Sequence, residues 1–264
     1  MTGYETIIVD VKPPFARITL NRPAQRNAMN FQMVEDLIAA FAALREDRSI
    51  RAVVLSGAGG HFCAGGDIGD LQAAAQMTEA EQDATVARLD VLLRAVNEAP
   101  QVVVASIDGA ALGGGFGLVC VSDIAVAATS ASFGLPEVRL GLAPAVIAPY
   151  VLQRLGPTRA RLLMLTGARF DGVSAHEYGL VHEVCPPEIL EECTQTVLNE
   201  LRQCSPHALA ACKTLLFASM RQSLDESLPY RARLLNSLRQ SADGQEGMLA
   251  FMSKRPPRWA EPSE

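Results

Sequence analysis

The strongest constraint on the fold is a pair of short apolar segments, each followed directly by a glycine-rich turn. Residues 52–56 and 102–107 are almost entirely apolar, and glycine-rich stretches follow them at 57–66 and 109–117. A strand without alternating polar residues is buried on both faces, as in parallel sheets that helices cover on each side. Glycines after such strands let backbone N–H groups approach a ligand closely. The pattern predicts an α/β core with binding loops at the strand ends.

The rest of the chain supplies helices and further strands in a repeating order. Asn30 is expected to cap one helix, and Thr78 with Glu81 forms a capping-box pattern for a second. Pro157 suits a helix start, and Ser174 is expected to cap a short turn. Further strands are expected at residues 5–11, 15–20, 123–128 and 181–184, and further helices at 188–203, 206–221, 224–240 and 244–253. These units predict one α/β core over residues 1–200 and a C-terminal helical oligomerisation region over residues 201–264.

Composition excludes several classes of protein. The chain has a net charge of −6 and no basic block, so no nucleic-acid partner is expected. No apolar segment approaches the ~20 residues that span a bilayer, and no basic, apolar leader is visible at the start, so no membrane partner is expected. The six cysteines show no CxxC pairing and the four histidines no HExxH motif, so no metal is expected. Reduced thiols of this kind favour a cytoplasmic protein.

Three stretches carry residues suited to chemistry at a carbonyl group. Two follow the buried strands, His61-Phe-Cys-Ala-Gly-Gly-Asp67 and Asp108-Gly-Ala-Ala-Leu-Gly-Gly-Gly-Phe-Gly-Leu118. The third is Phe133-Gly-Leu-Pro-Glu-Val-Arg-Leu-Gly-Leu142. Where a helix begins at such a turn, its unpaired N–H groups and positive dipole end favour an oxyanion. Two converging turns would hold a thioester oxygen as it gains charge, while Glu137 moves a proton at the neighbouring carbon. Either turn alone is better explained by tight turns and close packing.

Taken together, the motifs resemble the crotonase (enoyl-CoA hydratase/isomerase) family over about residues 5–257. The resemblance implies an α/β fold, a crotonase-like spiral of ββα units with a C-terminal helical trimerisation region, assembled as a homotrimer or a dimer of trimers. It also implies an acyl-CoA substrate whose thioester oxygen accepts from the N–H groups of Ala64 and Gly114. No metal or redox cofactor is implied, because CoA arrives as part of the substrate. The matching pieces are Ile18-Thr-Leu-Asn-Arg-Pro23, Arg26-Asn-Ala28, Phe62-Cys-Ala-Gly-Gly-Asp67, Gly109-Ala-Ala-Leu-Gly-Gly-Gly115, Ser122-Asp123, Phe133-Gly-Leu-Pro-Glu137, Leu140-Gly-Leu142, Thr166-Gly167, Gly179-Leu-Val181, Lys213 and Phe251-Met-Ser-Lys-Arg255.

Glu137 and Gly117 align with the two catalytic glutamates of that family, and only Glu137 keeps the carboxylate. The resemblance therefore implies Glu137 as the main acid/base. A two-glutamate addition of water cannot be assumed, and three alternatives stay open. Another group positions the water, or Glu137 serves as both acid and base, or the reaction is not hydration.

Residues 116–119 and 133–150 also resemble bacterial hydratases of 3-branched glutaconyl-CoA esters. Such enzymes act on isohexenylglutaconyl-CoA in acyclic terpene catabolism or on 3-methylglutaconyl-CoA in leucine catabolism, and the first resemblance is the closer one. The missing side chain at Gly117 is expected to leave room for a substituent at the β-carbon. The leading hypothesis is therefore a hydro-lyase acting on such an ester. The alternatives are an enoyl-CoA isomerase that uses a single glutamate, and an acyl-CoA-binding protein without catalysis.

Position in the family suggests further ligand contacts. For three residues a structural role is the stronger expectation. Asp67 is expected to cap a turn, Tyr150 to pack in the core, and Arg139 to meet solvent. Cys63 has no His–Asp partner and is expected to pack rather than attack. The suggested substrate contacts are Arg26, Ala28, Gly65, Gly66, Asp67, Gly117 and Tyr150, and the suggested CoA phosphate contacts are Arg22 and Lys254.

Overall fold

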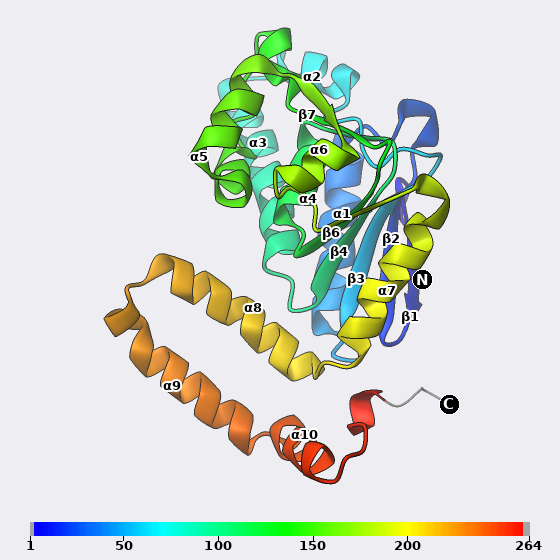
Figure 1. The fold of residues 1–264 in the computed structure, drawn as a ribbon. Helices are drawn as coiled ribbons and strands as arrows, with labels where there is room; N and C mark the ends of the chain where they lie inside the picture. Colours follow the sequence, from blue (N-terminus) through cyan, green and yellow to red (C-terminus); the bar gives the residue numbers. More distant parts are fainter. Residues whose placement is uncertain (1–2, 261–264) are drawn as a thin grey trace.

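A six-stranded sheet forms the centre of the computed structural model, which describes residues 3–260 (Figure 1). β1 and β2 form an antiparallel hairpin, and every other neighbouring pair in the sheet is parallel. All six strands were predicted from the sequence, with small differences at their ends. In spatial order they are β1 (Ile7–Lys12), β2 (Phe15–Leu20), β3 (Ala52–Gly57), β4 (Val102–Ile107), β6 (Ile124–Ala128) and β9 (Glu183–Cys185).

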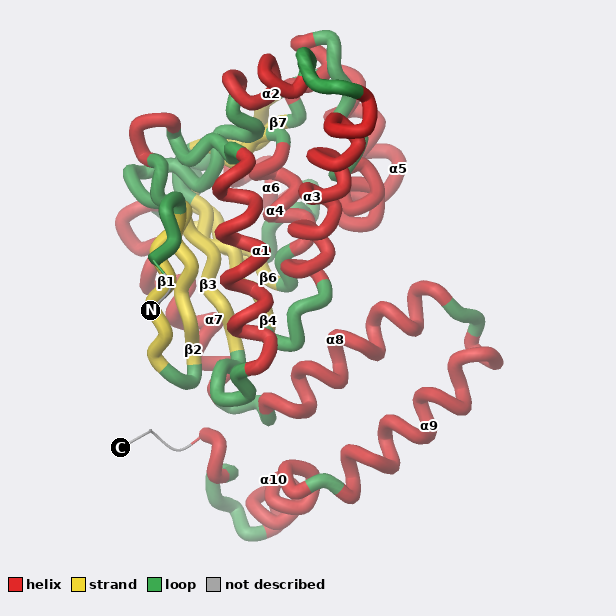
Figure 2. The backbone as a smooth tube through the Cα atoms, turned by 180° about the vertical axis from the view of Figure 1, so that it is seen from behind, coloured by secondary structure: helices red, strands yellow, loops and turns green. Residues whose placement is uncertain are grey.

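Helices cover both faces of this sheet. α1 (Phe31–Glu46) and α3 (Glu79–Asn97) lie on one face, and α7 (Leu190–Arg202) lies across the other (Figures 1 and 2). Alternate residues of β3 serve the two sides, because Val53 packs in the cluster that includes Leu37 of α1, whereas Val54 packs with Leu198 of α7. The central strands are therefore buried on both faces, which explains why they carry no alternating polar residues.

A second sheet of three short strands continues from the carboxyl ends of the first. Its order is β5 (Ala110–Leu112), β7 (Ser132–Gly134), β8 (Arg169–Asp171). Two of the long strands are each followed by a short strand and then a helix. These units are β4, β5 and α4 (Gly114–Val121), and β6, β7 and α5 (Ala148–Thr166). This repetition confirms the spiral of ββα units. The short strands, α2 (Ile68–Ala74) and α6 (Gly172–Glu177) leave too little periodicity for their bounds to be read from sequence.

Most helix starts follow the local capping signals. The side chains of Asn30 and Thr78 cap α1 and α3, the second through a reciprocal capping box. α5 is kinked directly before Pro157, so a new helical segment begins there as predicted. The prediction for Ser174 was wrong. The cap of α6 is Asp171, whose carboxylate accepts from the N–H of Ser174 at 2.8 Å.

The last three helices form an arm that stands away from the core (Figure 1). They are α8 (Pro206–Arg221), α9 (Leu224–Gln240) and α10 (Ala242–Met252). At the root of the arm, Lys213 is buried and donates to Asp123 at 2.7 Å and to the carbonyl of Gln101 at 3.0 Å. After α10, the indole N–H of Trp259 donates to the carbonyl of Gln203 at 3.0 Å, which returns the chain to that root. The division at residues 200 and 201 stays a prediction.

Candidate active site

Three segments meet at the carboxyl ends of β3 and β4. The turn after β3 is joined to β5 by Cys63, whose N–H donates to Ala110 at 2.7 Å and whose carbonyl accepts from Leu112 at 2.9 Å. The N–H of Gly113 donates to the carbonyl of Gly134 at 3.0 Å, which joins β5 to β7. These backbone contacts bring together the three stretches that the sequence predicted to converge.

Close approach at this junction requires glycine at two positions. Gly65 has φ +103° and Gly113 has φ +48°, in the region where other residues are strained. A Cβ on Gly113 would lie 2.9 Å from Oε1 of Glu137 and 3.7 Å from Cα of Gly65. The carboxyl group of Glu137 therefore lies directly against the two glycine turns.

Glu137 has the electrostatic character of a proton-transfer group. It lies in the 3-10 turn η2 (Pro136–Leu140), which follows β7. Within residues 3–260 its buried Oε2 has no hydrogen-bond partner. Burial raises the pKa of this carboxyl above its ordinary value of 4.5, because the charged form loses hydration, and a hydrogen bond to its own backbone opposes the shift. A carboxyl in this state can take up and return a proton at a neighbouring ligand atom.

The structure corrects the predicted pair of oxyanion donors. The N–H of Ala64 donates to the carbonyl of Arg26 at 3.0 Å, so it is not available to a ligand. Gly66 is exposed, and across the described chain no backbone carbonyl accepts from its N–H. Gly114, the first residue of α4, is half-buried, and its N–H likewise has no backbone acceptor in the described chain, because the first N–H groups of a helix have no intrahelical acceptor. Gly66 and Gly114 are therefore the residues that offer available donors here.

A buried amide that the sequence analysis left without a role organises the loop before α1. Asn27 is fully buried, and its amide donates to the carbonyls of Ala58 and His61 at 2.9 and 2.6 Å. Its Oδ1 accepts from the N–H of Arg22 at 2.8 Å. Asn27 thus ties this loop to the turn after β3. Its only sequence signal was its place in one of the matching motifs.

Several residues predicted to contact substrate or CoA instead hold this loop in place. Arg22 donates to the carboxylate of Asp67 at 2.9 Å and to the carbonyl of Ala28, so its charge is compensated within the chain. Asp67 caps α2, as the structural alternative predicted, and the hydrogen bond from Arg22 lowers the pKa of its carboxyl. Ala28 is half-buried, whereas Arg26 is exposed and remains accessible to a ligand.

The predicted pocket at Gly117 is filled. Gly117 is buried within α4, and a Cβ there would lie 2.4 Å from Cγ2 of Ile147 and 3.7 Å from Cδ2 of Leu93. The absent side chain accommodates the packing of α4 against the start of α5, so the expectation that it leaves room for a substrate branch is wrong. No local pattern in the sequence relates Gly117 to Ile147.

Tyr150 borders a cavity that Glu137 does not line, and Lys254 lies beyond the last helix of the arm. Tyr150 is half-buried on α5, packs against the main core as its structural alternative predicted, and borders a cavity of about 420 Å³ together with Arg94 and Met220. Lys254 directly follows α10, at the opposite end of the molecule from β7, the strand that leads to Glu137 (Figure 1).

Cys63 and Arg139 take the structural roles expected of them. Burial raises the pKa of the Cys63 thiol to about 11, so it stays protonated and unreactive at neutral pH. Arg139 is exposed and donates to the carbonyl of Thr166 at 3.2 Å. In the part of the chain that the structure describes, no group of His, Cys, Asp or Glu side chains is arranged to hold a metal ion. No helix in that part combines the length and apolar character needed to cross a bilayer.

Comparison with known proteins gives matches over almost the whole chain. A family model described as enoyl-CoA hydratase/isomerase matches residues 12–262. A probable enoyl-CoA hydratase (echA8) of Mycobacterium tuberculosis is 34% identical over 257 residues, which are 97% of this chain and 98% of that protein. The solved structure of Pseudomonas aeruginosa AtuE is 49% identical with a TM-score of 0.95, and the match covers 97% of this chain and 100% of that one. The solved structure of an enoyl-CoA hydratase/isomerase from Marinobacter aquaeolei is 43% identical with a TM-score of 0.93. That match covers 97% of this chain and 99% of that one.

Proposed function

Because this chain belongs to the enoyl-CoA hydratase/isomerase family, we propose that it adds water to the 2,3-double bond of a 3-branched glutaconyl-CoA. A hydratase-type lyase activity on an acyl-CoA follows from the family and from relatives matched over almost their whole length that are named probable enoyl-CoA hydratases. The observation that carries the chemistry is Glu137, whose buried Oε2 lacks a partner within residues 3–260 and whose carboxyl lies against the glycine turns.

In the proposed reaction, the thioester oxygen accepts hydrogen bonds from the N–H groups of Gly66 and Gly114. These donors draw electrons toward that oxygen and make C3 electrophilic. Glu137 removes a proton from water as the water oxygen bonds to C3, and the electrons of the double bond move through C2 onto the thioester oxygen as an enolate. The same carboxyl then returns the proton to C2 as the enolate collapses. One carboxyl thus performs both transfers and is regenerated.

The branched substrate is supported mainly by the resemblance of residues 116–119 and 133–150 to glutaconyl-CoA hydratases. An apolar wall beside the proposed oxyanion donor adds to it. Leu71 Cδ1 lies 3.5 Å from the position of a Cβ on Gly66, and Leu71 is 43% exposed. Ile68, on the same helix, is 56% exposed. Packing an alkyl branch against these side chains would gain ~25 cal/mol for each Å² of apolar surface removed from water. We therefore place the isohexenyl ester ahead of the methyl ester.

The test is a substrate panel in water labelled with heavy oxygen. Crotonyl-CoA, 3-methylglutaconyl-CoA and isohexenylglutaconyl-CoA are followed by loss of the conjugated thioester absorbance and by mass spectrometry of the products. Uptake of one labelled oxygen, with the highest kcat/KM on the isohexenyl ester, is the expected result. The highest kcat/KM on crotonyl-CoA would contradict the branched substrate.

One alternative activity is favoured by a specific observation, the single carboxyl of Glu137 against the glycine turns. One acid/base is sufficient to shift a double bond, so an enoyl-CoA isomerase would give an isomerised product that carries no label. Binding of all three thioesters without turnover would indicate an acyl-CoA-binding protein instead.

The arm supports assembly as a homotrimer or a dimer of trimers. Apolar side chains are exposed along it, with 79% exposure for Leu224, 86% for Phe251 and 74% for Met252. Large apolar side chains left this exposed support burial against another subunit. Because α10 lies far from β7 in one chain (Figure 1), we place Lys254 at the CoA phosphates of a neighbouring subunit. Analytical ultracentrifugation measures the assembly, and a monomeric full-length chain would contradict it.

A further inference from the structure

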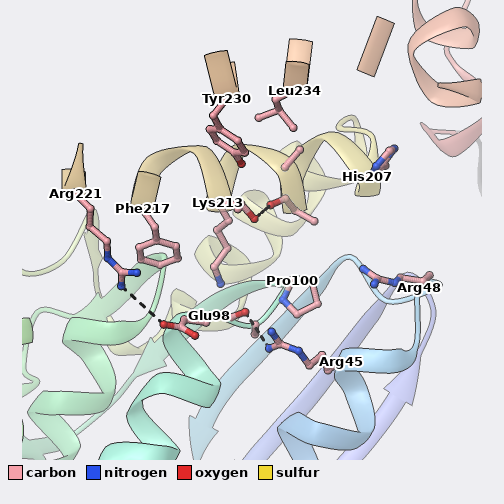
Figure 3. A pocket seen from close by; sticks show the side chains of 14 residues that line it. Arg45, Arg48, Glu98, Pro100, His207, Lys213, Phe217, Arg221, Tyr230 and Leu234 are labelled. Carbon is pink, nitrogen blue, oxygen red and sulfur yellow. Dashed lines mark hydrogen bonds and ion pairs between the residues drawn. The ribbon is translucent and has the colours of Figure 1, made fainter. Parts of the chain in front are cut away.

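A cavity that is partly open to solvent lies at the root of the arm, apart from Glu137. A cavity of about 530 Å³ is bounded by the end of α1, the turn at residues 98–100, α8 and α9 (Figure 3). Volumes of ~300–1,000 Å³ are typical of small-molecule sites. Its lining residues include none of those that surround Glu137, so the proposed hydration leaves this cavity without a role.

The cavity carries positive charge on a chain whose net charge is −6. Arg45, Arg48, Lys213 and Arg221 line it, and Glu98 is the only carboxylate among the described lining residues. Cations gathered along a concave wall of low dielectric strengthen the field that attracts an anion. The local charge is therefore opposite to that of the molecule as a whole.

Two of these cations are compensated and two are not. Lys213 is held in the buried ion pair at the root of the arm, and Arg221 lies 4.0 Å from Glu98. Arg45 donates only to the backbone carbonyl of Glu98, at 3.1 Å, which does not cancel its charge. Arg48 is exposed, and no acceptor for its guanidinium is found in the part of the chain that the structure describes. Arg45 and Arg48 can therefore still bind an anion.

The cavity also has an aromatic end. Phe217 and Tyr230 line it from α8 and α9, and both are half-buried. Figure 3 shows these two rings on one side of the cavity and Arg45 and Arg48 on the other, beside Pro100. Guanidinium groups bind phosphate oxygens through paired, charge-assisted hydrogen bonds, and aromatic rings stack on nucleobases. The two ends thus match the two parts of a nucleotide.

We propose that this cavity binds a nucleoside diphosphate, with its phosphates at Arg45 and Arg48 and its base at Phe217 and Tyr230. A free phosphate or pyrophosphate uses the cationic end alone and binds more weakly. Because Lys213 of the cavity wall holds α8 to the core, the bound nucleotide contacts both the core and the arm. The site is independent of the acyl-CoA chemistry at Glu137.

The test is isothermal titration calorimetry of the full-length chain with ADP and with pyrophosphate at low salt. The chain should bind both, and ADP more tightly. Arg48→Glu should weaken both ligands at least about tenfold, because a charge-assisted contact becomes a repulsion. Phe217→Ala should weaken ADP about tenfold and leave pyrophosphate unchanged, because only the base is stacked. Arg161→Glu, an exposed charge reversal on α5 outside the cavity, is the matched control and should change neither.

Three outcomes would overturn the proposal. One is the absence of ADP binding to the full-length chain. Another is ADP binding that both Arg48→Glu and Phe217→Ala leave unchanged, which places the nucleotide elsewhere, as at the acyl-CoA site. The third is an altered sedimentation coefficient for Arg48→Glu, which makes the cavity a subunit interface instead. Arg48 is exposed, so its substitution leaves the core packing intact and circular dichroism should confirm an unchanged fold.

Discussion

Replacing Gly117 with alanine sets two opposing effects against each other in the centre of α4. Alanine is favoured over glycine inside a helix by ~1 kcal/mol, through the smaller entropy lost on folding. The fold opposes this gain, because the new Cβ would lie 2.4 Å from Cγ2 of Ile147. Ile147 is 3% exposed and cannot swing into solvent. The added methyl group must therefore overpack the contact between α4 and α5.

Overpacking of a core typically costs ~1–3 kcal/mol, which exceeds the helical gain. We expect Gly117→Ala to be destabilising by about 1 kcal/mol net, which lowers Tm by ~2–4 °C in a chain of this size. Ile147→Leu removes the offending Cγ2 branch at constant volume and should cost less than ~1.5 kcal/mol alone. In the Leu background Gly117→Ala should become neutral or stabilising, so the two changes couple by ~1–3 kcal/mol.

Wild type, the two single variants and the double variant form a double-mutant cycle. Their Tm values are compared at one protein concentration, because the Tm of an oligomer depends on concentration. Each is also assayed on branched and linear thioesters, and Gly117→Ala should leave the ratio of their kcat/KM values unchanged, because the position faces Ile147. A Gly117→Ala protein more stable than wild type, or additive effects in the double variant, would refute the packing argument. A selective loss of branched-substrate turnover would restore a substrate pocket at Gly117.

Other substitutions probe the proposed mechanism and the arm. Glu137→Gln should lower kcat ~10²–10⁴-fold without lowering Tm at neutral pH, and turnover above a tenth of wild type would remove Glu137 from the mechanism. Burial raises the pKa of Glu137, so kcat/KM should rise with pH through a value above 4.5. The contribution of this carboxyl to the free energy of unfolding should fall as pH rises from 4.5 through that same value. If the Glu137→Gln variant still loses stability over this pH range, the loss does not come from Glu137. Gly114→Pro, at a helix position that accepts proline, should lower kcat ~10²–10³-fold by deleting a donor N–H, and a folded variant with normal kinetics would exclude that donor. Lys213→Met should cost ~3–5 kcal/mol, toward the lower end because the Asp123 side chain keeps 24% exposure, as measured by denaturant unfolding; an unchanged midpoint would show that the pair does not hold the arm.

Local signals predicted the long elements because they depend on residues that are close in the chain. The bounds of β2, β4, α8 and α9 agree with those read from the sequence, and Asn30 and Thr78 cap the helices assigned to them. The three-residue strands of the second sheet were missed because no periodicity develops over so few residues. Ser174 was mistaken for a cap because both Ser and Asp are good N-cap residues. Asp171, three residues earlier, is the actual cap, and its carboxylate accepts from the N–H of Ser174.

The candidate site was only partly predictable. The resemblance placed Glu137 beside the glycine turns, and the folded chain supports that placement. The raised pKa of Glu137 was not predictable, because it arises from burial by segments distant in the sequence. The structural alternatives for Asp67, Tyr150 and Cys63 were the better predictions, since each followed from a local pattern of capping or apolar neighbours.

The sequence by itself determined the order of buried strands and glycine turns, the helix caps, and the carboxylate that faces those turns. Only the tertiary structure decided which backbone donors remain available and which space is filled. Ala64 is not an available donor because its N–H is taken by Arg26, and Gly117 makes no pocket because Ile147 packs on it. An available N–H or an empty volume depends on both partners of a long-range contact, because most buried backbone groups find a partner as the chain folds. No single segment carries that information.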